Sequence, residues 1–372
     1  MTFRKSAPAL LIAASLAAIL GVTGVAYRLT NGLLENAEEG SYKLMRDVLA
    51  SILKSTEDRA LVRAELVASM PSVRAAFLAR DRPKLLAETQ AMFGVQVEKY
   101  GLDQAQFHLA PGVSFLRLHN PAKFGDDQRA YRPMLSDVHQ SRALRKGVAV
   151  TRSGPAIAGI VPIADDEGKH FGSFEMGLEF APMLDKIKAS YGLEVAVYID
   201  EKMLRDISTD LGGEVVTPKN RVGKYIRFHA THPDLMAALV ADDDVEVAEP
   251  KSYSRRAAGA PWGVQLVPMY NYANHQIGVY ALAKDFSETR ATEGRSRVWQ
   301  LLAALCGVVF MSGAVLVVVR GVLLRPLRVL TDRLAALADG DEAPPAGPAD
   351  GYCEELRSLV ASYERLRSRR GP

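Results

Sequence analysis

Two uncharged apolar runs constrain the fold of this 372-residue chain more than any other feature of its sequence. The first run covers residues 7–27 and the second covers residues 298–319, and neither contains Asp, Glu, Lys or Arg. A helix needs about 20 apolar residues to cross the hydrocarbon core of a bilayer, so we predict two transmembrane helices. The alternative for the first run is a cleaved signal peptide, whose apolar core is shorter, at roughly 7–15 residues.

The positions of Lys and Arg predict the orientation of these spans. Arg4 and Lys5 precede the first span, and Arg320 begins a basic stretch directly after the second. We therefore expect both chain ends in the cytoplasm, with residues 1–6 as a short tail. Residues 28–297 then form one domain outside the cytoplasm, which in a bacterium is the periplasmic face of the inner membrane.

Composition excludes several classes of protein. The chain has 46 basic and 43 acidic residues, a balance that argues against a nucleic-acid binder. Its two cysteines, Cys306 and Cys353, lie outside residues 28–297, so we expect no disulfide framework and no zinc knuckle there. His108 and His119 fall on different predicted strands and form only a generic metal-site pattern, so we predict no metal site. Residues 28–297 also lack the Gly-x-Ser-x-Gly, His-Glu-x-x-His and phosphate-loop patterns. We predict no catalytic residues and no cofactor, and we disfavour an anchored hydrolase.

The pattern within residues 28–297 predicts a long helix followed by mixed helix and sheet. No Pro or Gly interrupts residues 41–70, and a helix over residues 28–82 fits the apolar spacing. Runs typical of strands follow at residues 106–109, 114–119, 148–151, 156–162 and 171–178, with a helix at 133–144 between the second and third. This order favours an antiparallel sheet with a helix on one face.

A second copy of this arrangement follows. Residues 161–180 align without gaps on residues 267–286, with four identical pairs at one offset: Val161/Val267, Pro162/Pro268, Gly172/Gly278 and Phe180/Phe286. Further strands are predicted at 193–199 and 225–229, and a helix at 233–240. The spacing of Arg227 and His229 also repeats that of Arg117 and His119. We infer a distal module over residues 83–190 and a proximal module over residues 191–286.

The stretch FLRLHNPAKFGDDQRAYR at residues 115–132 makes a family resemblance specific. It resembles a signature of double Cache sensors, the extracytoplasmic domains of bacterial sensor kinases and chemoreceptors. The resemblance covers about residues 28–297 and implies an α+β fold with two tandem PAS-like modules. It also implies that the domain binds a small molecule.

The segment after the second span resembles a HAMP domain over residues 320–368. Two sets of apolar residues are spaced alternately three and four positions apart, as in a coiled coil. The first set is Leu327, Leu330, Leu334 and Leu337, and the second is Leu356, Leu359, Tyr363 and Leu366. A linker at 339–351, rich in Pro and Gly, separates them. The resemblance implies a parallel homodimeric four-helix bundle that passes a signal to an output domain or to a separate kinase, cyclase or chemotaxis protein.

Five residues of the distal module are candidates for ligand binding. Arg117 and Arg132 could form paired hydrogen bonds to a carboxylate-like anion, and His119 could donate another. Asp126 could orient an arginine or accept from the ligand, and Glu175 could pair with an arginine or face solvent. The alternative is a purely structural salt-bridge network in which residues 125–127 only form a turn before the helix. We interpret His139, His170 and His275 as surface residues.

Two functions remain open at this point. The first is a dimeric transmembrane receptor that binds a small, anionic extracellular solute in the distal module. The second is a membrane-anchored dimeric scaffold whose extracytoplasmic domain recognises another envelope protein.

Overall fold

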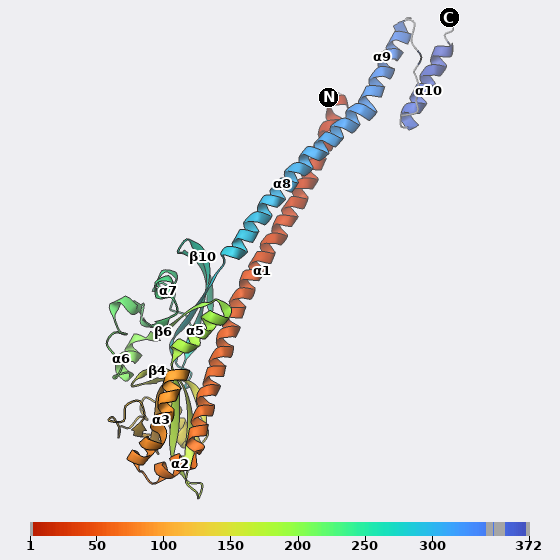
Figure 1. Cartoon of the computed structure of the whole chain (residues 1–372). Helices are drawn as coiled ribbons and strands as arrows, with labels where there is room; N and C mark the ends of the chain where they lie inside the picture. The colour runs from red at the N-terminus through yellow and green to blue at the C-terminus, as the bar shows by residue number, and fades with distance from the viewer. Residues whose placement is uncertain (1–2, 340–344, 346–353, 370–372) are drawn as a thin grey trace. The chain divides into compact units, whose positions relative to one another are not determined.

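The computed structural model describes residues 3–339, 345 and 354–369. The chain forms two compact units, residues 36–288 and a second unit from residues 1–35 and 289–372. Helix α1, Phe3–Ser69, begins in the second unit and continues into the first (Figure 1). We describe the two units separately.

Three helices open the 36–288 unit. Helix α1 ends at Ser69, and α2 (Pro71–Leu78) and α3 (Arg82–Tyr100) follow. The single helix predicted over residues 28–82 is therefore wrong at its end. Pro71 starts a new helix because proline is favoured in a first turn and cannot continue the preceding helix. At α3, the Asp81 carboxylate accepts a hydrogen bond from the Lys84 amide at 3.0 Å and caps the helix.

The distal sheet has five antiparallel strands in the order β2-β1-β5-β4-β3. Its strands are β1 (Leu102–Leu109), β2 (Val113–Arg117), β3 (Arg145–Thr151), β4 (Gly154–Ala164) and β5 (His170–Leu178). Helix α4, Pro133–Ser141, lies between β2 and β3 in the chain. All five predicted strands and the predicted helix are confirmed, each within a few residues of its expected bounds.

The proximal sheet has six strands in the order β7-β8-β6-β11-β10-β9. Its strands are β6 (Glu194–Asp200), β7 (Arg221–Val222), β8 (Tyr225–Ala230), β9 (Lys251–Ala257), β10 (Ala260–Tyr270) and β11 (Gln276–Asp285). Its helices are α5 (Phe180–Tyr191), α6 (Glu201–Ile207), the short 3-10 helix η1 (Pro218–Asn220) and α7 (Pro233–Leu239). The structure thus contains two mixed helix-and-sheet modules in tandem, as the sequence predicted.

The internal repeat is confirmed at the level of strand register. Val161 pairs with Phe174 across β4 and β5, and Val267 pairs with Tyr280 across β10 and β11, at the same separation in the chain. A Cβ added to Gly172 would overlap the carbonyl oxygen of His108, and one added to Gly278 would overlap that of Tyr198. Both glycines therefore stand where a hairpin strand passes closest to the backbone of the neighbouring central strand.

The repeated Arg-x-His spacing is not part of this duplication. Arg117 pairs with Gln106 in the distal sheet, whereas Arg227 pairs with Tyr198 in the proximal sheet. Through the shared hairpin register, Tyr198 corresponds to His108 and not to Gln106. The two arginines therefore occupy different positions on their sheets, and the match in spacing is coincidental.

An apolar core joins α1, α2 and α3 to one face of the distal sheet. Phe77 of α2 packs against Phe107, Phe115 and Phe171, with ring centroids 5.2–5.6 Å apart. Helix α1 approaches β4 so closely that a Cβ at Gly159 would overlap the backbone of Leu61. With this face covered by helices, the opposite face of the sheet is the one available for a binding site.

Apart from Pro345, the described residues of the second unit are helical. Besides the first part of α1, it comprises most of α8 (Ser287–Val318), the π-helical segment η2 (Val319–Leu324), α9 (Arg325–Asp339) and α10 (Glu354–Arg369). Among the described residues, α1 from Leu11 onward and the helical stretch Ser287–Asp339, which begins with α8, are long and apolar enough to cross a membrane. The amide of Gln300 on α8 donates to the Thr30 hydroxyl on α1 at 2.7 Å.

The two predicted leucine stripes pack on each other only in part. Leu327 and Leu330 of α9 contact a cluster on α10: Leu356, Val360 and Tyr363. Leu334, Leu359 and Leu366 remain exposed. Except for Asp339 and Pro345, the predicted linker at residues 339–351 lies outside the described residues.

We predict that Gly278→Ala destabilises the proximal module by about 1–3 kcal/mol, the usual cost of overpacking, because the added methyl would meet backbone that cannot rotate away. The matched control is Gly212→Ala, since no atom lies within 4 Å of a Cβ at Gly212. Thermal unfolding of the full chain in detergent, followed by circular dichroism, measures both. Equal melting temperatures for the two variants would contradict the close approach.

Candidate functional site

The face of the distal sheet that points away from α1 is buried and polar. Residues of β1 and β5 alternate between the two faces, and Gln106 pairs with Glu175 while His108 pairs with Ser173. These four side chains share the polar face, and all are buried. Burying so many polar groups is unfavourable unless they find partners, so their partners define the site.

The loop between β2 and α4, residues 118–132, folds back along the outer edge of β2. The Gly125 amide donates to the Ser114 carbonyl at 2.8 Å, and the Ser114 amide donates to the Asp126 carbonyl at 2.9 Å. Arg82 of α3 donates to the Phe115 and Pro121 carbonyls, both at 2.8 Å. The loop is therefore held at both ends of its turn, and it carries Asp126 and Gln128 onto the polar face.

Arg117 and Asp126 form the first charged cluster, at the loop. The Arg117 guanidinium donates to the Asp126 carboxylate at 2.8 Å, and Arg152 lies 3.4 Å from the same carboxylate. The Tyr131 hydroxyl accepts from Arg152 at 3.1 Å and donates to Asp126 at 3.4 Å. Burial raises the pKa of Asp126, but its hydrogen bond to Arg117 and that cation's charge outweigh burial and lower the pKa overall.

Arg132 and Glu175 form the second charged cluster, deeper in the module. Their ion pair joins the N-cap residue of α4 to the middle of β5, and both side chains are almost completely buried. The Gln128 amide oxygen accepts from Arg132 at 3.4 Å. Because an isolated buried charge is costly, this pair and its neighbours must form together.

A line of histidines continues from Glu175 toward the surface. His108 Nε2 lies 3.6 Å from Glu175 Oε2, and neither atom has a hydrogen-bond partner. His108 Nδ1 and His139 Nε2 each lie 3.3 Å from the Ser173 hydroxyl, and His139 Nδ1 lies 2.7 Å from His170 Nε2. Burial, followed by the charge of Arg132, holds the pKa of His108 well below its usual range. Burial, with a smaller contribution from His170, lowers the pKa of His139 to about 4.

The structure brings four of the five candidate residues into two pairs. Arg117 contacts Asp126, and Arg132 contacts Glu175, so Glu175 does not face solvent. His119 belongs to neither pair: β2 ends at Arg117, and His119 Nδ1 contacts the backbone of Ala105 at 3.3 Å. Burial lowers the pKa of His119.

The polar side chains of β1 were not among the residues predicted for the site, and two histidines predicted at the surface lie elsewhere. Gln104, Gln106 and His108 alternate with the apolar residues Ala105 and Phe107, a pattern that indicates one polar and one apolar face. That signal was present in the sequence and would have added His108 to the candidates. His139 and His170 are half-buried and bonded to each other, and so are not simple surface residues.

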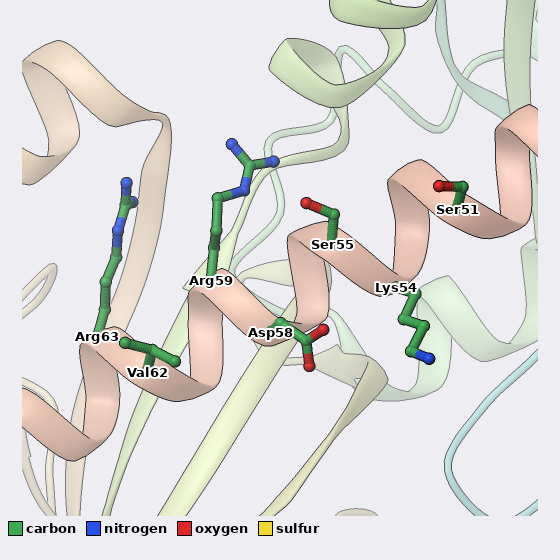
Figure 2. Close-up of a pocket in the computed structure, with 7 residues that line it drawn as sticks. All are labelled: Ser51, Lys54, Ser55, Asp58, Arg59, Val62 and Arg63. Atoms are coloured by element: carbon green, nitrogen blue, oxygen red, sulfur yellow. The ribbon is translucent and has the colours of Figure 1, made fainter.

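Three hollows lie around the distal module. A cavity of about 40 Å³ adjoins the start of α4, between Arg132 and Tyr272. An open groove of about 520 Å³ follows the end of β4, and another of about 440 Å³ follows α1. Figure 2 shows the α1 groove, with Arg59 and Arg63 on one side of the helix and Asp58 on the other.

The corresponding face of the proximal sheet has different chemistry. At the positions that match His108, Gln106, Ser173 and Glu175 by register, it carries Tyr198, Ala196, Val279 and Ala281. These residues belong to an apolar cluster under α7. A charged ligand therefore finds matching groups on the distal face and not at these proximal positions. Among the residues that the structure describes, no group of three or more His, Cys, Asp or Glu side chains is placed to hold a metal ion.

Solved structures with a similar arrangement include extracellular sensor domains. An extracellular ligand-binding receptor from Desulfohalobium retbaense matches with 11% identity and a TM-score of 0.35, over 63% of this chain and 39% of that one. The ligand-binding domain of a Campylobacter jejuni chemoreceptor, in complex with 4-methylisoleucine, matches with 10% identity and a TM-score of 0.40, over 69% and 92%. The sensor domain of the V. cholerae histidine kinase DctB matches with 9% identity and a TM-score of 0.38, over 66% and 97%.

No curated protein matches the sequence. Residues 35–289, more than half of the chain, match a sensory domain family. The chain therefore belongs to the dCache_3 family, described as the double sensory domain of two-component sensor kinases.

Proposed function

We propose that this protein is a membrane-anchored homodimeric receptor that binds a small anionic solute on the polar face of the distal module. The observation that carries the proposal is the pair of charged clusters on this face: Arg132–Glu175, which is almost completely buried, and Arg117–Asp126, whose carboxylate is partly exposed. The proximal positions that match His108, Gln106, Ser173 and Glu175 carry no charge. The buried arginine of that face, Arg227, donates to the Pro233 carbonyl and to the Asn220 amide oxygen. Folding alone does not require such charges, because apolar residues of similar volume usually stabilise a core as well or better.

The charges on this face favour an anion. Three guanidinium groups, of Arg117, Arg132 and Arg152, face two carboxylates, of Asp126 and Glu175. With the histidines neutral, one positive charge is left over. A ligand with one carboxylate-like group would balance it and could accept paired hydrogen bonds from a guanidinium.

The chain offers a route from this site toward the second apolar helix. Helix α4 begins next to Arg132, and its Asp137 accepts a hydrogen bond from Tyr272 at the tip of the β10–β11 hairpin. Strand β11 ends at Asp285, and α8 begins at Ser287. In the proposed receptor, α1 and α8 anchor the periplasmic domain in the inner membrane, and α9 and α10 act as a HAMP-like relay to an output domain or a partner protein.

One exposed stripe of α1 fits a dimer contact. Leu44, Ser51, Ser55, Val62 and Leu66 fall within a narrow strip at 100° per residue, and all are exposed. The two serines lie at the middle of this stripe, with the apolar residues Leu44, Val62 and Leu66 on either side of them, so a second helix could approach closely there. The exposed Leu334, Leu359 and Leu366 of α9 and α10 give the relay a second surface that a partner copy would cover.

We predict that a small monoanion raises the melting temperature of the full chain in detergent, in a screen of carboxylates, phosphates and sulfonates. A ligand at about 100 times its dissociation constant stabilises the folded state by roughly 2.7 kcal/mol. The double variant Arg132→Gln/Glu175→Gln should keep the fold, because it replaces a buried ion pair by two neutral amides, and should lose the ligand response.

The matched control for this screen is Glu201→Gln/Arg205→Gln. It also replaces an ion pair by two amides, but this pair lies on α6 and its Arg205 side chain is exposed. It should respond to the ligand as the wild type does. A response that survives in the Arg132/Glu175 double variant would place the binding site elsewhere. No response to any anion would favour recognition of another envelope protein.

We predict that Ser55→Cys forms a disulfide-linked dimer under mild oxidation, in a background without Cys306 and Cys353. The control is Ala50→Cys, because Ala50 is also exposed on α1 but lies about 140° further round the helix. Non-reducing gels of the membrane fraction measure the product. Equal cross-linking at both positions would contradict the proposed stripe.

A further inference from the structure

Arg227 is a buried guanidinium of the proximal module that has no counter-ion. It lies on β8, and only 7% of its surface is exposed. It donates to the Pro233 carbonyl at 3.1 Å and to the Asn220 amide oxygen at 3.5 Å, and both acceptors are neutral. Within the described part of the chain, no Asp or Glu forms an ion pair with it. Such a charge is costly to bury, because neutral acceptors do not balance it.

The half-buried and buried carboxylates of the proximal module already hold other groups. Their contacts are Glu194 with Lys188, Glu201 with Arg205 and Arg221, Asp210 with Lys123, Asp244 with Arg255, and Asp200 with the Met203 amide. Asp234 is nearest to Arg227 in the sequence, but its side chain is exposed and forms no ion pair with that arginine. The charge of Arg227 therefore needs a partner from outside the module.

The hydroxyl of Tyr198, the cross-strand neighbour of Arg227, also has no partner. Tyr198 on β6 pairs directly with Arg227 on β8, so the two side chains leave the same face of the sheet at adjacent positions. Tyr198 is fully buried, and its hydroxyl finds no hydrogen-bond partner among the described residues. Burial raises the pKa of Tyr198, and the charge of Arg227 opposes this only in part. The phenol therefore stays neutral and can donate a hydrogen bond.

These two groups have complementary needs that one kind of ligand meets. A water molecule would satisfy the Tyr198 hydroxyl, but it would leave the guanidinium charge unbalanced. An anion satisfies both groups, because it accepts a hydrogen bond from the phenol and others from the N–H groups of Arg227.

The surroundings restrict the anion to a small one. Arg227 and Tyr198 share their side of the sheet with the apolar cluster under α7, which includes Leu235, Met236 and Val279. The two acceptors of Arg227 belong to the first residue of α7 and to η1, so both elements lie directly against the guanidinium. A bulky anion would displace these side chains, whereas an anion of a few atoms need not.

We propose that Arg227 and Tyr198 form a second anion site, in the proximal module, for a chloride ion or a short carboxylate such as formate. The anion accepts from the Tyr198 hydroxyl and from the guanidinium, and it supplies the counter-ion that the module lacks. The site is separate from the polar face of the distal module and does not rest on the proposed function.

The test compares melting temperatures of the full chain in detergent, in sodium chloride, sodium formate and sodium gluconate at equal concentration and pH. Gluconate carries the same charge but is too bulky for the site. We expect chloride or formate to raise the melting temperature above that in gluconate, increasingly so above the dissociation constant. A rise with only one of them identifies a halide or a carboxylate site, and no rise with either would overturn the proposal.

Two arginine variants separate this site from a general salt effect. Arg227→Gln should lose the difference between the small anion and gluconate. The matched control is Arg255→Gln, because Arg255 belongs to the same sheet but has Asp244 as its counter-ion. The control should keep the difference. A response in Arg227→Gln equal to that of the wild type would overturn the site.

Tyr198→Phe tests the hydroxyl with the charge of Arg227 kept, and it serves alone should Arg227→Gln fail to fold. In gluconate the variant should melt at or above the wild-type temperature, because it removes a buried hydroxyl that has no partner. In the favoured small anion it should melt below the wild type, because the anion then loses one donor. The same order of melting temperatures in both salts would overturn the site.

The distal double variant Arg132→Gln/Glu175→Gln distinguishes the two proposed sites. It should keep the response to chloride or formate, since Arg227 lies in the other module. Loss of the response in this variant, together with its retention in Arg227→Gln, would place the small anion in the distal module. That result would overturn the proximal site and would support the proposed function.

Discussion

The cost of burying Arg132 and Glu175 determines how the distal module is built. Removing charged groups from water costs several kcal/mol per ion, so each ion needs its counter-ion and further polar neighbours within the protein. Glu175 is fixed on a central strand, and Arg132 reaches it from the N-cap of α4. The pair can therefore form only when loop 118–132 has folded over β2 and placed the first turn of α4 against the sheet.

The apolar packing of α4 follows from this placement. Met134, Leu135 and Val138 of α4 lie on Ala158 and Ile160 of β4. The small Ala158 leaves room for the helix, and the ion pair sets its position along the strand. Apolar contacts alone tolerate a shift of this kind, whereas a buried ion pair has one favourable geometry. The charged and apolar contacts thus support a single arrangement of α4 over the polar face.

The duplicated modules show which features a fold requires and which a site requires. Both hairpins keep the same register, and both keep a glycine where a strand passes the neighbouring backbone. These shared features are steric and serve the sheet. The polar side chains on this face differ between the modules: Ala281 stands where Glu175 would be, and the buried arginine of the proximal face, Arg227, stands at a different position from Arg117. Divergence at these positions costs the fold little, because an apolar face packs at least as well.

Much of this architecture could be predicted from the sequence because local patterns carry it. The alternation of residues facing opposite sides of the sheet predicted the distal strands. The Val-Pro and Gly residues shared by residues 161–180 and 267–286 predicted the second hairpin. The end of α1 was misjudged although Pro71 stood in the sequence, since apolar spacing alone does not report where one helix stops and the next begins. The pairing of Glu175 with Arg132 was one of two open alternatives, because strand alternation gives the face but not the partner.

Local sequence patterns did not predict the position of His119 or the contacts among the histidines. His119 was expected beside Arg117 because both fit one alternating strand, but β2 ends at Arg117 and the chain turns. His139 and His170 are 31 residues apart and meet only because α4 lies over the start of β5. Contacts of this kind depend on how a helix sits on a sheet, and no period in the sequence encodes that placement.

Ligand binding at such a site is an exchange and not a simple addition. Arg132 already holds Glu175, so an anion can bind it only by replacing a carboxylate that is fixed in the protein. The free energy gained from the new ion pair would be largely offset by the pair that is lost. In the proposed receptor, such an exchange would act on the first turn of α4, and Asp137 of α4 contacts Tyr272 in the hairpin that leads to α8.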